Sequence, residues 1–96
     1  MSVRITCVNK DNGDHYDPNE GITHLGWVNE ESLVNGKSTR QEMVKFVEGG
    51  NQAYTKDSLG IRAYLVVRVS RAGNKYVKTV ANGKETDNLL HLQECK

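Results

Sequence analysis

The chain contains few of the residues that distinguish special classes of protein: one proline, one tryptophan, one phenylalanine and two cysteines. Its longest apolar run, AYLVV at residues 63–67, is far shorter than the roughly 20 residues that a membrane-spanning helix needs. The first residues, MSVRITCVNK, contain no apolar segment followed by a cleavage site. We therefore expect no secretory signal, no association with a membrane, and a cytoplasmic protein.

An excess of charge of one sign is also absent. The 13 lysines and arginines nearly balance 12 aspartates and glutamates, which gives a net charge of +1. No overall field therefore draws the protein towards nucleic acid, a membrane surface or an acidic partner. With 36% hydrophobic and 26% charged residues, the 96-residue chain is expected to form a single soluble domain, residues 1–96.

The two cysteines, Cys7 and Cys95, lie near opposite ends of the chain and lack the CxxC spacing of redox and metal motifs. A lone pair is not a disulfide framework, and a reducing cytoplasm keeps thiols free. We expect two thiols that pack as small core or edge residues. If the first and last strands are neighbours in the sheet, the two side chains could still approach each other.

Alternation of apolar and polar residues predicts that most of the chain is strand. In the first strand, residues 3–9, the side chains of Val3, Ile5 and Cys7 share one face. Further strands are predicted at residues 22–28, 52–55, 61–70, 75–80 and 88–92, with Asn-Gly turns at 12–13 and 82–83.

Helical periodicity replaces this alternation at residues 39–48. Ser38 or Thr39 can act as the N-cap, with Gln41 or Glu42 three residues later to complete a capping box. The apolar stripe that follows ends at two glycines. The expected fold class is therefore α+β, with about five mainly antiparallel strands, one helix packed on one face of the sheet, and the other face in solvent.

The stretch DNGDHYDPNEGITH, residues 11–24, gathers four acidic residues and two histidines. If Gly13 were the glycine of a calcium loop, Val8, Lys10 and Asn12 would fall on ligand positions, so that pattern fails. For zinc, His15 and His24 are nine residues apart across an irregular loop. Turn formation explains the polar residues, and we expect no metal and no cofactor.

The segment NGKSTR, residues 35–40, ends like a phosphate-binding loop. The first glycine of that pattern would fall on Glu31, whose carboxylate would repel phosphate. An ordinary capped helix explains the segment.

Nucleophilic catalysis requires a nucleophile and a base within hydrogen-bond reach. Only Cys7 or Cys95 with His24 or His91 offers that combination. In a strand, His91 and Cys95 would lie ~13 Å apart, too far for a direct contact. We therefore expect that the protein is not an enzyme, and a small Cys/His metal protein or enzyme is the second alternative.

The hairpin predicted at residues 61–80 places basic residues and tyrosines outward. The inward face would consist of Ile61, Ala63, Leu65, Val67 and Val69. The outward face would carry Arg62, Tyr64 and Arg68 from one strand and Lys75, Tyr76 and Lys78 from its partner. Such a surface can contact a phosphate backbone and stack bases, so nucleic-acid binding is the first alternative function.

Several spaced motifs resemble the small prokaryotic family catalogued as domain of unknown function 3892. They are Thr39, Arg40 and Glu42 at the helix start, Gly49 at its end, Tyr76 and Thr79 in a strand, Asp87, Asn88, Leu89 and Leu90 in a turn, and Cys95 near the end. Where the family has a proline after the last leucine, this chain has Gln93. The resemblance implies a shared fold and no particular activity.

Taken together, these features predict a non-catalytic binding or interaction module whose partner the sequence does not identify. An exposed edge strand could pair with a protein partner or a second copy. Among the motif residues, Thr39, Arg40, Glu42, Asp87 and Asn88 are expected to be structural. Arg40 in the first turn of a helix opposes the helix dipole, so we expect Asp87 to pair with it.

Overall fold

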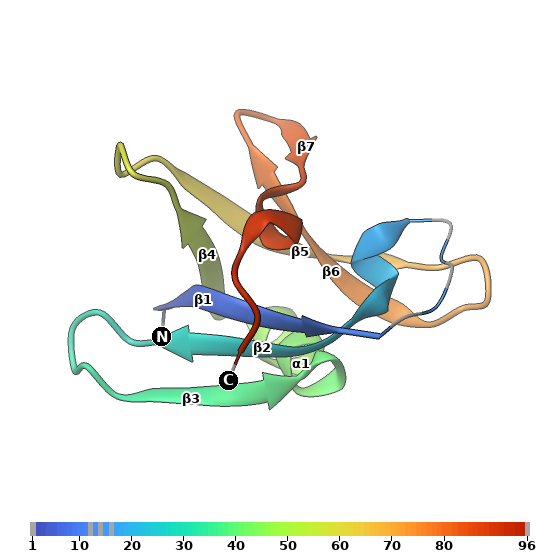
Figure 1. Cartoon of the computed structure of the whole chain (residues 1–96), viewed down its shortest axis with the longest axis horizontal. Coiled ribbons are helices and arrows are strands. Elements are labelled where there is room, and N and C mark those ends of the chain that lie inside the picture. The colour runs from blue at the N-terminus through green and yellow to red at the C-terminus, as the bar shows by residue number, and fades with distance from the viewer. Residues whose placement is uncertain (1, 12, 14, 16, 96) are drawn as a thin grey trace.

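The computed structural model describes residues 2–11, 13, 15 and 17–95. Within that part of the chain, a seven-stranded sheet packs against one α-helix and two short 3₁₀ turns (Figure 1). In chain order the elements are β1 Ser2–Lys10, η1 Pro18–Gly21, β2 Ile22–Val28, β3 Asn35–Thr39, α1 Arg40–Glu48, β4 Gln52–Lys56, β5 Arg62–Val69, β6 Lys75–Ala81, β7 Lys84–Thr86 and η2 Asn88–His91. The predicted α+β class and the single helix are confirmed.

The strand order is β3-β2-β1-β4-β5-β6-β7, and every neighbouring pair is antiparallel except β1 and β4. β4 pairs with β1 only along Ser2–Arg4. Further along β1, the C-terminal tail, residues 93–95, pairs with this strand in place of β4. The Val8 amide donates to Gln93 O at 3.0 Å, and the Cys95 amide donates to Val8 O at 3.3 Å. The two ends of the chain therefore meet at β1 (Figure 1).

A β-bulge changes the expected alternation of β1. Ile5 pairs with Trp27 and Cys7 pairs with Gly26, so Thr6 has no partner of its own on β2. An extra residue reverses the facing of every side chain beyond it. Val3, Ile5 and then Val8 are buried, and the prediction that Cys7 shares their face is wrong.

The helix begins as its sequence predicts. The Thr39 hydroxyl accepts a hydrogen bond from the Glu42 amide at 3.2 Å, and the Glu42 carboxylate accepts one from the Thr39 amide at 2.8 Å. Hydrogen bonds to its carboxylate from the backbone and the side chain of Thr39 lower the pKa of Glu42 below its usual value. Met43 and Val44 are buried against the sheet, which confirms the predicted apolar stripe.

Three short segments differ from their predicted structure. Residues 35–39 form β3, although their glycine and polar residues have low strand propensity, because a hairpin pairs them with β2. Residues 84–86 form the edge strand β7 after the predicted turn, where Asn82 and Gly83 have φ values of 54° and 76°. Residues 88–92, predicted as a strand, contain the turn η2, because a short apolar run does not distinguish the two. The other predicted Asn-Gly turn includes Asn12, which lies outside the described residues.

One hydrophobic cluster joins the sheet, α1 and η2. Leu89 of η2 is fully buried, and Ala63 and Leu65 of β5 enter the same core. Ile61 and Val69, predicted to be inward, are 55% and 61% exposed, because Ile61 precedes β5 and Val69 is its last residue, both beyond the packed core. None of the helices described is long and apolar enough to cross a membrane.

Candidate functional site

Strand pairing determines which of the predicted basic residues share a face. Tyr64 pairs with Val80 and Arg68 pairs with Tyr76, so these side chains lie on one side of the β5–β6 hairpin. Lys75 pairs with Val69 on the opposite side, where its ammonium lies 2.7 Å from Glu48 of α1. The prediction that Lys75 belongs to the same surface is therefore wrong.

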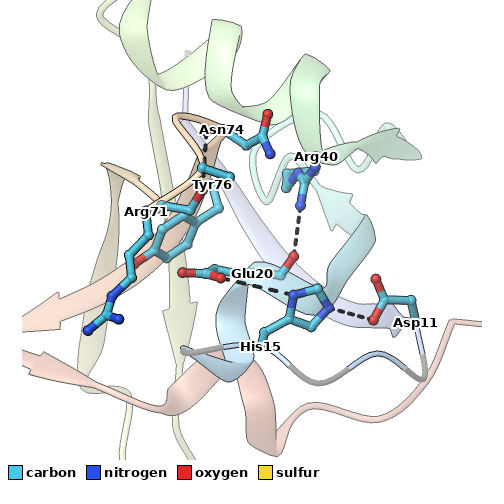
Figure 2. Close-up of a pocket in the computed structure, with 9 residues that line it drawn as sticks. Asp11, His15, Glu20, Arg40, Arg71, Asn74 and Tyr76 are labelled. Carbon is cyan, nitrogen blue, oxygen red and sulfur yellow. Dashed lines mark hydrogen bonds and ion pairs between the residues drawn. The ribbon is translucent and has the colours of Figure 1, made fainter.

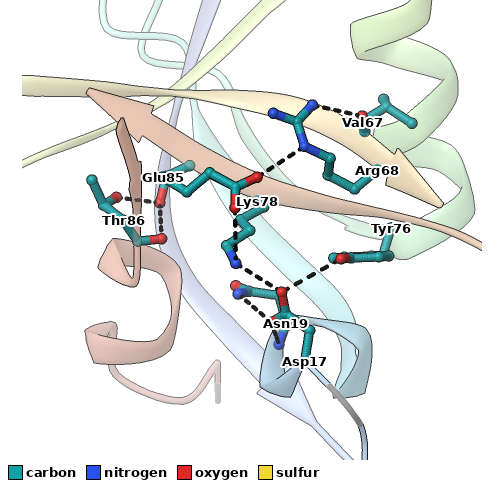
Figure 3. A network of polar contacts seen from close by, with 9 residues as sticks. Asp17, Asn19, Val67, Arg68, Tyr76, Lys78, Glu85 and Thr86 are labelled. Atoms are coloured by element: carbon teal, nitrogen blue, oxygen red, sulfur yellow. Dashed lines mark hydrogen bonds and ion pairs between the residues drawn. The ribbon is translucent and has the colours of Figure 1, made fainter. Parts of the chain in front are cut away.

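Carboxylates neutralise two other basic residues of that surface, Arg68 and Lys78, as Figure 3 shows. Arg68 Nε lies 2.9 Å from Glu85, and Lys78 Nζ lies 2.7 Å from Asp17. Tyr76, predicted to point into solvent, is only 8% exposed. The cause is tertiary: η1 folds against β6 and brings Asp17 onto a face that local alternation predicted to be free.

Arg62 and Tyr64 also have intramolecular partners. The Arg62 guanidinium lies 4.3 Å from the centre of the Tyr54 ring, in a cation–π contact, and the Tyr64 ring centre is 6.0 Å from that of Tyr54. The Tyr54 hydroxyl donates a hydrogen bond to Glu30. Burial and this bond to Glu30 raise the pKa of Tyr54. The geometry thus favours a structural role for Arg62, Tyr64 and Tyr54 over stacking against nucleic-acid bases.

The Asp17–Lys78 pair yields a prediction about pH. Burial opposes ionisation of Asp17, but hydrogen bonds from Lys78 and Asn19 outweigh it and hold the pKa of Asp17 below its usual value. A carboxyl group whose pKa is lower in the folded state than in the unfolded state stabilises the fold at pH values above its unfolded-state pKa. This stabilisation is lost as the pH falls through the folded-state pKa. Asp17→Asn should therefore destabilise the protein in urea unfolding at about pH 7, and the difference from wild type should shrink at about pH 3.

The matched control for this measurement is Asp87→Asn, because Asp87 is exposed and its side chain makes no capping hydrogen bond to η2. Its effect should be small at both pH values. An Asp17→Asn penalty that stays constant with pH would contradict the prediction.

A polar pocket of about 330 Å³ lies where four segments of the chain meet. Figure 2 shows it between α1, η1 and the tip of the β5–β6 hairpin. Its lining consists of Asp11 and His15 after β1, Glu20 of η1, Arg40 of α1, and Ser70, Arg71, Ala72, Asn74 and Tyr76 of the hairpin. The volume is in the range of small-molecule sites.

Two carboxylates flank His15 on one side of the pocket. His15 Nε2 lies 2.8 Å from an oxygen of Asp11, and His15 Nδ1 lies 4.0 Å from an oxygen of Glu20. The Gly13 amide donates a second hydrogen bond to Asp11 at 3.0 Å. The bonds from His15 and Gly13 lower the pKa of Asp11. Asp11 and Glu20, from the stretch of residues 11–24, therefore form an acidic side of the pocket, and the imidazole of His15 lies between their carboxylates.

Arg40 forms the opposite wall. Its Nη1 donates a 2.7 Å hydrogen bond to the backbone carbonyl of Glu20, while its Nε is buried and has no hydrogen-bond partner among the described residues. The predicted pair with Asp87 is wrong, because η1 folds over the start of α1 and supplies an acceptor there. Arg40 therefore lines the pocket while one of its nitrogens fastens η1 to the start of α1.

The remaining predicted residues fall elsewhere. Thr39 and Glu42 form the capping box of α1, and Asn88 Nδ2 donates to Thr55 Oγ1 at 3.2 Å. His24 Nδ1 lies 3.0 Å from Thr23 Oγ1 and does not line the pocket. Among residues 2–11, 13, 15 and 17–95, no group of three or more His, Cys, Asp or Glu side chains is placed to hold a metal ion.

Cys7 and Cys95 form a disulfide, so the expectation of two free thiols is wrong. The bond is possible because the tail pairs with β1 beside Val8. Gly26 is part of the same arrangement: a Cβ atom there would overlap Cys7 Sγ and lie 3.1 Å from Cys95 Sγ. A glycine inside a predicted strand indicates such a close approach. Gly26 is therefore the feature of the sequence from which this contact could have been predicted.

Comparison with known proteins identifies a family. A family model described as "Protein of unknown function (DUF3892)" matches residues 4–93. No curated protein and no solved structure matches the chain.

Proposed function

Since the chain belongs to the DUF3892 family of proteins of unknown function, we propose its role from its own geometry: a non-catalytic binding module whose ligand occupies the pocket between η1, α1 and the β5–β6 hairpin. The ligand class we propose is a small zwitterion that carries a carboxylate and an ammonium group, as a free amino acid does. The observation that supports it most is that the lining joins two carboxylates, those of Asp11 and Glu20, with the guanidinium group of Arg40.

Charge of both signs lines the pocket. Arg40 provides a guanidinium group, which suits a ligand carboxylate because it offers several donors in a fixed plane. Asp11 and Glu20 provide carboxylates that can accept hydrogen bonds from an ammonium group. A simple anion would be repelled by Asp11 and Glu20, and a simple cation would be repelled by Arg40.

The pocket favours binding over catalysis, because its reactive groups are already engaged. Both ring nitrogens of His15 face carboxylates, so neither is directed at a ligand as a general base. Ser70 Oγ accepts a 3.1 Å hydrogen bond from the Asn74 amide within the hairpin turn. The Tyr76 hydroxyl lies 3.4 Å from Asp17. No activated nucleophile is therefore assembled among the described residues of the lining.

Titration of the labelled protein with a panel of free amino acids, followed by NMR, tests this function. We expect saturable shifts at the Asn74 and Tyr76 amides for at least one of them, and much weaker shifts with acetate or methylamine alone. Arg40→Met should abolish the response, because it removes the charge and keeps much of the apolar stem.

The control is Arg68→Met, which removes an arginine that pairs with Glu85 outside the pocket. This variant should bind as the wild type does. If no saturable shifts appeared up to about 10 mM amino acid, the free energy of binding would be weaker than roughly 3 kcal/mol, and the zwitterion site would be ruled out. Equal losses in both arginine variants would show that the response is general electrostatics.

A further inference from the structure

The Cys7–Cys95 disulfide fastens the C-terminal tail to the middle of β1. Apart from this bond, the tail meets β1 through two backbone hydrogen bonds at Val8 and one from Asn9 Nδ2 to Cys95 O at 3.1 Å. Among the described residues beyond Leu92 none is buried: Gln93 and Glu94 are exposed, and Cys95 is partly exposed. The disulfide is therefore the strongest link that holds this short segment in place.

The disulfide lies at the surface and not in the core. Both cysteines are partly exposed, and they line an open groove of about 550 Å³ together with residues of β1, β2 and β3. The bulge at Thr6 is what turns Cys7 away from the core and towards this groove. A thiol in solution can therefore reach the sulfur atoms without unfolding the protein.

The register of the sheet adds a cation to this groove. Cys7 pairs with Gly26, and Gly26 pairs with Lys37, so the three residues form one row across β1, β2 and β3. Because Gly26 has no side chain, the middle position of this row places no side chain between Lys37 and the cysteines. A neighbouring ammonium group stabilises a thiolate and makes it a better leaving group.

We propose that the Cys7–Cys95 bond is a thiol–disulfide exchange site and that its reduction releases the C-terminal tail from β1. A thiolate attacks Cys95 Sγ, forms a mixed disulfide there and expels Cys7 as a thiolate, which then takes up a proton. A second thiol displaces Cys95 and leaves as a disulfide with the first. Two reductant thiols are thus oxidised, and two protein thiols are formed.

Release of the tail would change what β1 can bind. The Val8 amide and carbonyl now pair with Gln93 and Cys95, and both would lose their partners. An open stretch of strand edge can accept a strand from another chain. In a reducing compartment the edge would be open, and in an oxidising one the tail would cover it.

The rate of reduction of the folded protein tests the site itself. With dithiothreitol as the probe, we expect a rate that rises in proportion to its concentration without a plateau. Reduction that required global unfolding would instead level off at the unfolding rate, and such a plateau would overturn the proposal. Lys37→Met should slow the reaction several-fold, whereas Lys45→Met, a lysine on α1 outside this groove, should leave it unchanged.

Hydrogen exchange then tests the release of the tail. After reduction, the amides of Val8 and Cys95 should exchange much faster, while the amide of Leu25 in the core should stay protected. Unchanged protection at Val8 and Cys95 would show that the tail stays in place and would contradict the proposal. This measurement uses the wild-type chain, so it remains decisive if the Lys37 variant folds poorly.

Discussion

Replacing Cys95 with serine is expected to lower the free energy of unfolding by roughly 4 to 5 kcal/mol, the largest effect that we predict for a single substitution. The disulfide joins residues 88 positions apart, so it constrains nearly the whole unfolded chain. In the chain-entropy model the stabilisation increases with the length of the closed loop. Because domains of this size are stable by about 5 to 15 kcal/mol, the variant would keep only part of its stability.

Urea unfolding followed by the fluorescence of Trp27, the single tryptophan, measures this loss. Cys7→Ser should have nearly the same effect, and the double variant should be no less stable than either single one, because one bond is removed in each case. Wild-type protein kept in reductant is a further control. A loss below about 1 kcal/mol would mean that the unfolded chain is already constrained in other ways.

Leu89→Ala is expected to cost about 2.7 to 5.0 kcal/mol. Leu89 comes from η2, outside the sheet and the α-helix, yet its side chain is fully buried in the cluster formed by them. Truncation would remove buried apolar surface and leave a cavity that the surrounding strands cannot fill, since they are fixed by their own hydrogen bonds.

The matched control is Leu59→Ala in the β4–β5 loop, where the leucine is 83% exposed. The same chemical change there should alter stability by no more than about 0.5 kcal/mol. If Leu89→Ala and Leu59→Ala had equal effects, η2 would be a surface turn and not part of the core. Urea unfolding of both variants under one set of conditions decides between these outcomes.

The pocket illustrates why a site is harder to predict than an element. The composition of the stretch that holds Asp11, His15 and Glu20 points to polar chemistry, but its spacing fits no metal motif and does not predict a pocket. The unfavourable place of Arg40 in the helix predicts that it needs a partner, but the sequence does not identify the Glu20 carbonyl as that partner. The β5–β6 hairpin tip gave no local sign of function, because its loop residues are ordinary turn formers. Only the folding of η1 beside α1 and β6 brings these groups together.

The sequence by itself determined the features that depend on near neighbours. The helix cap at Thr39, the Asn-Gly turn at residues 82–83 and the main strands follow from contacts within a few residues, and the structure confirms them. Tertiary structure alone decided the bulge at Thr6, the partner of Cys95 and the burial of Leu89. Each of these depends on segments that are distant in the chain, and local propensity carries no information about which of them will meet.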